Sequence, residues 1–132
     1  MMPDRVTLTR QILAAGSWEA KNRLLVQVAR ELPELTAGER SEANRVHGCE
    51  SNVWLITHWQ DARLTLRLDS DSRVIKGLLA LVLAAYDGQP RTAIAGIDFN
   101  GWLAELGLAR FLSSSRANGL AAIVQRIRDQ AA

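Results

Sequence analysis

One cysteine carries the most reactive side chain in this chain of 132 residues. Cys49 stands in the segment RVHGCESNVW, residues 45–54, just ahead of an apolar run. A single thiol cannot close an internal disulfide, so Cys49 is a buried inert thiol, a reactive thiol or the site of a transient link to another molecule. Gly48 would let the backbone turn tightly and a partner approach the sulfur. His47, as an imidazolium, would favour the thiolate if the chain stays extended between the two residues.

The chain has few residues that could form other kinds of reactive site. Soft metals and iron–sulfur clusters need several thiolates or imidazoles, and the chain has one cysteine and two histidines. A cysteine protease needs a base held by a third group, and neither His47 nor His58 lies in a recognisable motif. We therefore expect no metal and no cofactor bound by this chain.

Composition narrows the class of protein. The hydrophobic content is 48%, with three prolines and no low-complexity tract, which is typical of one folded domain spanning 1–132. The net charge of +2 is spread along the chain without a basic stripe, so we expect no nucleic acid partner. No segment resembles a signal peptide or the roughly 20 apolar residues of a membrane span, which predicts a cytoplasmic protein without membrane contact.

Hydrophobic periodicity predicts the elements that would position the cysteine. Residues 18–33 show an amphipathic helical stripe that ends at Pro33. Residues 53–59 and 63–69 alternate as the two strands of a hairpin, separated by the three residues QDA. Both faces of the first strand are expected to be largely covered.

The second half of the chain is predicted to be helical. A buried central helix begins after an N-cap at Asp69 or Ser70 and ends near Gly88. Two short helices are broken around 98–101 and at Gly107, and a last helix follows the serines at 113–115. The predicted fold class is α+β, a small antiparallel sheet packed against helices.

Four segments resemble the SufE-like sulfur acceptors, the family that includes SufE and CsdE. They are GCESNVW at 48–54, DSDSRVIKGLLA at 69–80, SSSRANGLAAI at 113–123 and ELPEL at 31–35, in the family's order and spacing over nearly the whole chain. Leu68 stands where the family often has glycine, and Ser114 where it often has proline. Glu50 resembles CsdE, whereas Ser51 and the wider chain resemble SufE more closely.

The resemblance implies a fold similar to the IscU scaffold proteins and a partner, a PLP-dependent cysteine desulfurase of the SufS or CsdA kind. The PLP belongs to the partner. Cys49 would accept the persulfide sulfur and carry it to a downstream iron–sulfur scaffold. We expect the loop to hold its thiol against the apolar sheet at rest and to swing out in the complex, with rapid amide exchange over 46–51.

The remaining candidates support the loop or contact the partner. His47, Gly48, Glu50 and Ser51 flank the cysteine. Asp71 and Arg116 lie in the other two signatures and would fix the loop by a charge-assisted hydrogen bond, although helix capping or a solvated pair accounts for them equally well. Lys76 is a contact by resemblance alone, since its position is the polar edge of an apolar helix.

Three functions stay open on this basis: a covalent sulfur relay, a module that activates the desulfurase without carrying sulfur, and a redox-sensing thiol. The last would need a thiol of low pKa and a resolving cysteine, and the chain has no second cysteine. As a sulfur carrier the protein would be an accessory to an enzyme. A homodimer also stays open.

Overall fold

An antiparallel hairpin forms the sheet in the computed structural model, which describes residues 3–131. Strands β1 (Val53–Gln60) and β2 (Arg63–Ser70) pair in register, from Val53 opposite Ser70 to Gln60 opposite Arg63. The loop has two residues, Asp61 and Ala62, both at positive φ (53° and 62°). The predicted three-residue connection was one residue too long, because a two-residue turn of this hand matches the twist of the strands and lets β1 continue through Gln60.

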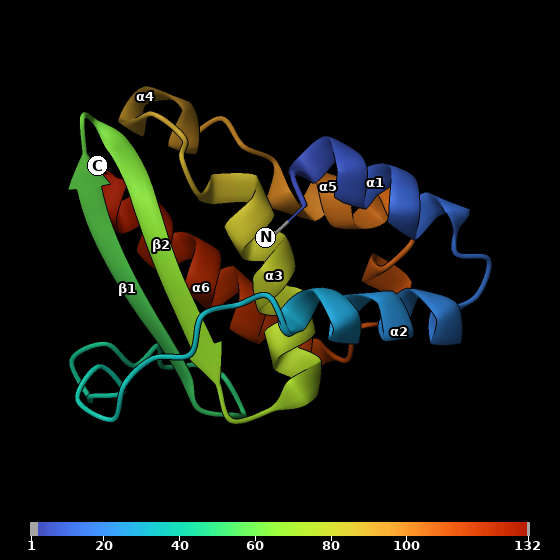
Figure 1. Cartoon of the computed structure of the whole chain (residues 1–132), viewed down its shortest axis with the longest axis horizontal. Helices are drawn as coiled ribbons and strands as arrows, with labels where there is room; N and C mark the ends of the chain where they lie inside the picture. Colours follow the sequence, from blue (N-terminus) through green and yellow to red (C-terminus); the bar gives the residue numbers. More distant parts are fainter. Residues whose placement is uncertain (1–2, 132) are drawn as a thin grey trace.

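Helices lie on one side of this hairpin (Figure 1). The alternation predicted for β2 is confirmed, since Leu64, Leu66 and Leu68 are buried. The expectation that both faces of β1 are covered was wrong. Trp54 and Ile56 are only half-buried and His58 is exposed, because their face points away from the helices.

The central helix α3 (Arg73–Tyr86) packs against β2 and α2, and its buried residues include Leu78, Leu79 and Val82. Its N-cap is Ser72, whose Oγ accepts from the backbone N–H of Ile75 at 3.4 Å. The predicted caps Asp69 and Ser70 were wrong, since both lie in β2 with their side chains committed to other bonds.

The last helix α6 (Ser114–Ala131) is as predicted, with Ser113 accepting from the N–H of Arg116 at 3.2 Å. Its buried stripe comprises Gly119, Leu120, Ile123, Val124 and Ile127. In Figure 1 this helix runs behind the hairpin and α3, and it contacts both β1 and α3.

Two helices precede the sheet: α1 (Arg5–Ala14), which the periodicity did not predict, and α2 (Trp18–Ala29). Asp4 caps α1, whose Leu8 and Ile12 are fully buried. Helix α2 ends four residues before Pro33, and hydrogen-bonded turns cover the remaining residues as far as Leu32.

Short helices fill the stretch between α3 and α6: α4 (Arg91–Ile94), α5 (Phe99–Glu105) and the 3-10 helix η1 (Ala109–Phe111). Asp98 caps α5, so the chain breaks before Asp98 and not through Gly101. Gly107, at φ 73°, ends the segment where predicted. The α+β class is confirmed, and no helix within residues 3–131 is long and apolar enough to cross a membrane.

Candidate functional site

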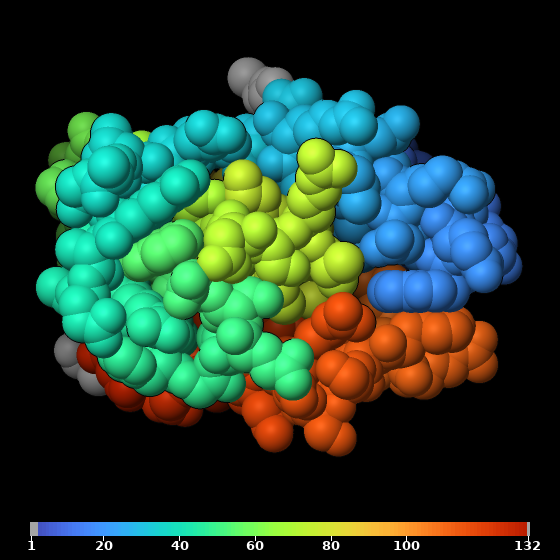
Figure 2. All heavy atoms as spheres, turned by 90° about the horizontal axis from the view of Figure 1, so that it is seen from below, coloured from blue at the N-terminus to red at the C-terminus, as the bar shows by residue number. Residues whose placement is uncertain are grey.

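The Cys49 loop, residues 47–52, lies on the face shown in Figure 2, beside the start of α3 and the start of α6. The chain before it runs along β1. Val46 donates its N–H to the carbonyl of Val53 at 2.8 Å, and Leu55 donates to the carbonyl of Asn44 at 2.8 Å. These two bonds bring the ends of the loop together.

Helix α6 fixes the chain just before the loop. The guanidinium of Arg126 donates to the carbonyls of Arg45 and Ala43. The position of the loop is therefore tied to α6 as well as to β1.

The other end of the loop is bonded to the junction between β2 and α3. Ser70 Oγ donates to the carbonyl of Asn52 at 2.6 Å, and the Nδ2 of Asn52 donates to Asp71 Oδ2 at 2.8 Å. Ser72 donates its N–H to Ser70 Oγ at 3.2 Å. Asp71 thus supports the loop through Asn52.

The thiol itself packs on α6. Cys49 Sγ lies 3.6 Å from the carbonyl oxygen of Gly119, and a Cβ at Gly119 would lie 3.2 Å from the sulfur. Gly48 has a φ of 98°, a conformation that L side chains rarely adopt, and a Cβ there would lie 3.4 Å from the Cβ of Ala122. Two glycines, one in the loop and one in the helix, allow the close approach.

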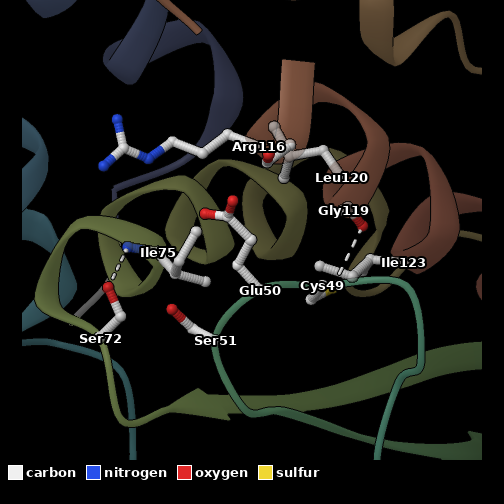
Figure 3. A pocket seen from close by; sticks show the side chains of 10 residues that line it. Cys49, Glu50, Ser51, Ser72, Ile75, Arg116, Gly119, Leu120 and Ile123 are labelled. Carbon is white, nitrogen blue, oxygen red and sulfur yellow. Dashed lines mark hydrogen bonds between the residues drawn. The ribbon is translucent and has the colours of Figure 1, made fainter. Parts of the chain in front are cut away.

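The sulfur borders a small pocket of about 50 Å³ between the loop, α3 and α6 (Figure 3). Apolar side chains from both helices form its floor: Ile75, Leu120 and Ile123. The expectation that the thiol rests against the sheet was wrong, because the sulfur packs on Gly119 of α6 and the pocket beside it is walled by α3 and α6, with no residue of β1 or β2 in its lining. The remaining lining residues are Cys49, Glu50, Ser51, Ser72, Ser115, Arg116 and Gly119.

Burial raises the pKa of the Cys49 thiol, and the nearby charge of Arg45 opposes this only in part. The thiol at rest is therefore the protonated, poorly nucleophilic form at neutral pH. His47 does not act on it here. The imidazole is exposed, and its Nε2 lies 3.1 Å from Glu42 Oε1.

The structure brings several predicted residues together and leaves others apart. Glu50, Ser51 and Arg116 line the pocket with Cys49. Within residues 3–131 the guanidinium of Arg116 makes no hydrogen bond to the loop. Lys76 lies outside the pocket and pairs with Asp69, with its Nζ 3.2 Å from Oδ1.

Asp69 is the centre of a buried polar cluster behind the site, with a relative exposure of 2%. Its Oδ2 accepts from Arg40 at 2.7 Å and from the N–H of Leu35 at 3.1 Å, and its Oδ1 accepts from the N–H of Ser70 at 2.8 Å. Burial alone would raise the pKa of this carboxyl, but the bonds from Arg40, Leu35, Ser70 and Lys76 together hold the pKa below its ordinary value. The cluster joins the segment before the loop to β2 and α3.

Sequence reasoning missed the helical walls of the pocket, above all Gly119. A signal was present, because a glycine in the middle of a strong helical pattern often marks a close approach of another chain segment. Nothing in the sequence identified Cys49 as the group that approaches. Within the described residues, no three His, Cys, Asp or Glu side chains are grouped so that they could hold a metal ion.

Comparison with known proteins places residues 7–131 in one family. The model of the SufE Fe-S metabolism associated domain matches residues 7–131. An uncharacterised SufE-like protein of Rhizobium etli is 40% identical over 118 residues, which cover 86% of this chain and 80% of that protein. The solution structure of a hypothetical protein from Thermus thermophilus shares the fold, with a TM-score of 0.76 at 20% identity, covering 99% of this chain and 96% of that chain.

Proposed function

The chain belongs to the SufE family, and from this premise we propose that Cys49 accepts persulfide sulfur from a PLP-dependent cysteine desulfurase and passes it on for iron–sulfur cluster assembly. A single observation carries the proposal. The only thiol of the chain lies on a loop held at both ends, with its sulfur at a small pocket that can shield one added atom.

The chemistry is one thiol exchange. The Cys49 thiolate attacks the outer sulfur of the desulfurase persulfide, the sulfur–sulfur bond of that persulfide breaks, and the desulfurase cysteine leaves as a thiolate. The outer sulfur remains on Cys49 as a new persulfide. The proton lost by Cys49 returns through solvent to the leaving thiolate, so the step needs no oxidant or reductant.

The resting geometry supports a loop that reacts only in a complex. Partial burial against α6 keeps the sulfur protonated, which lowers its reactivity toward oxidants between transfers. The attack requires the loop to leave Gly119 and expose the sulfur to the partner. The raised pKa also disfavours the redox-sensor interpretation, which needs a thiolate at neutral pH.

The desulfurase supplies the PLP chemistry, and this chain supplies the acceptor. An iron–sulfur scaffold downstream would take the sulfur from Cys49. We place this relay in the cytosol, where thiols are kept reduced.

The test is the intact mass of the protein after incubation with a desulfurase and free cysteine, without reductant. We expect a gain of one sulfur atom, mapped to the peptide that contains Cys49, and faster turnover by the desulfurase. Cys49→Ser should gain no sulfur and lose at least about tenfold of the stimulation, because the hydroxyl cannot take part in exchange.

A matched control is Ser51→Ala, which changes a loop residue beside the pocket but keeps the thiol. It should still gain sulfur. A Cys49→Ser variant that stimulates the desulfurase as well as the wild type would contradict the relay and favour the module that activates without carrying sulfur.

A further inference from the structure

In the part of the chain that the structure describes, three arginines near the Cys49 loop have guanidinium groups without a partner. Within residues 3–131, the side chains of Arg30, Arg73 and Arg116 make no hydrogen bond or ion pair. Arg116 lines the Cys49 pocket, whereas Arg30 and Arg73 line a neighbouring groove of about 270 Å³ together with Val26, Ala29 and Lys76. The second hollow has no role in the sulfur exchange itself.

The first turn of α3 separates the two hollows. Ser72 and Ile75 line the Cys49 pocket, and Arg73 and Lys76 line the groove. Residues three apart share a face of a helix, so the same turn presents one pair to the thiol and the other pair to the groove. Figure 2 shows the loop, the start of α3 and the end of α2 side by side on this face.

The charge on this groove is not neutralised by the fold. Among the described residues that line it, Lys76 is held by Asp69, which leaves the exposed side chains of Arg30 and Arg73 as the free cations. Of the nearby acids, Asp71 already accepts from Asn52, and Glu50 lies at the Cys49 pocket. Arginine pairs with carboxylates through two parallel bonds and is enriched in protein interfaces.

We infer that the groove bordered by Arg30 and Arg73 docks acidic side chains on the surface of the desulfurase, next to its persulfide. This inference rests on the proposed function. Charge pairs at the rim of an interface steer the encounter and fix its orientation more than they add affinity. Because the groove adjoins the Cys49 pocket across one helical turn, a carboxylate docked there would orient the partner's sulfur toward the loop.

The test reverses the two charges. The variant Arg30→Glu/Arg73→Glu should raise the apparent KM for this protein in the desulfurase assay about tenfold at low salt, with the rate at saturation unchanged. Added NaCl should weaken binding by the wild type and strengthen binding by this variant, because salt screens the attraction in the first case and the like-charge repulsion in the second. A charge-neutral Arg30→Gln/Arg73→Gln variant should fall between the two.

The matched control is Arg10→Glu/Arg63→Glu, which makes the same change in net charge. Arg10 lies in α1, and Arg63 begins β2 at the end of the hairpin opposite the Cys49 loop (Figure 1). The control should keep the wild-type KM. Equal shifts in both double variants, or no shift in either, would overturn the groove as a docking site.

The result for the groove can be distinguished from the result for the sulfur relay. If the wild type gains no sulfur in the mass experiment, the relay fails, but the KM for stimulation still reports on docking. If the wild type gains sulfur and Arg30→Glu/Arg73→Glu keeps both its KM and its salt dependence, only the groove fails. Circular dichroism of the variants confirms that each is folded.

Discussion

Cys49 and Gly119 are 70 residues apart in the chain, and their contact partly buries the thiol. The missing side chain at Gly119 lets the sulfur lie against the backbone of α6, where burial raises its pKa. A glycine inside a helix costs about 1 kcal/mol relative to alanine. The position therefore gives up helix stability to accommodate the sulfur.

Gly119→Ala should separate the burial of the sulfur from the cost of a glycine in the helix. The new Cβ would lie 3.2 Å from Sγ, so the loop must shift away from α6 and expose the thiol. We expect alkylation of Cys49 by iodoacetamide in the free protein to become at least about threefold faster, while the free energy of unfolding stays the same or rises by up to about 1 kcal/mol.

Asn118→Ala is the control, since Asn118 is an exposed neighbour on the same helix. It should leave the alkylation rate unchanged. If Gly119→Ala alkylates at the wild-type rate, the contact does not govern the exposure of the sulfur.

At the scale of elements, the sequence predicted those whose apolar residues repeat with a clear period. The alternation of Leu64, Leu66 and Leu68 and the buried stripe of α6 belong to this group. Helix α1 escaped prediction because only Leu8 and Ile12 are buried, whereas Val6 and Leu13 are 65% and 52% exposed. Which apolar residues of α1 are buried depends on its tertiary contacts, so the sequence period alone does not reveal the helix.

The start of α3 shows a second limit of sequence reasoning. The run DSDS at 69–72 offers four capping residues, and local chemistry does not choose among them. Tertiary contacts decide which of these residues caps the helix. Asp69 pairs with Arg40 and Lys76, Ser70 donates to the carbonyl of Asn52, and Asp71 accepts from the side chain of Asn52. Ser72 is therefore left to cap the helix. The pocket walls were unpredictable for the same reason, since they depend on how α6 packs.

The Asp69 cluster should therefore matter for stability. Asp69→Asn removes a buried charge and leaves Arg40 and Lys76 without their anion, so we expect a loss of about 2–4 kcal/mol in the free energy of unfolding at pH 7. Denaturation in urea measures this loss. Glu105→Gln, an exposed position on α5, should change it by less than about 0.5 kcal/mol.

The pH dependence of this loss has a definite sign. The pKa of Asp69 is lowered by folding, so its contribution is fully present above the unfolded value of about 3.9 and disappears as the pH falls through the folded value. The difference between wild type and Asp69→Asn should shrink below about pH 4. A difference that is constant from about pH 7 to about pH 3 would show that the carboxylate charge is not the source of the stability.

At the scale of the whole molecule, the Cys49 loop is attached to a packed body at both of its ends. Sheet, α3 and α6 share the core, and the bonds at Asn44, Val46 and Asn52 attach the loop to that body at both ends. Among the described residues, no backbone N–H of 47–52 donates a hydrogen bond to the sheet or to a helix. The sulfur can therefore leave α6 without breaking any element of the fold.

Hydrogen exchange tests this division. Amides 47–52 should exchange close to the rate of an unstructured peptide, whereas Val46 and Leu55, whose N–H groups are bonded, should be slowed at least about tenfold. The boundary thus begins one residue later than the expected 46–51, because Val46 is bonded to Val53. Binding of the desulfurase should slow 47–52 and leave Val46 and Leu55 unchanged. Amides 47–52 that exchange as slowly as Val46 in the free protein would mean that the loop moves only with the body, and transfer would then require the core to open.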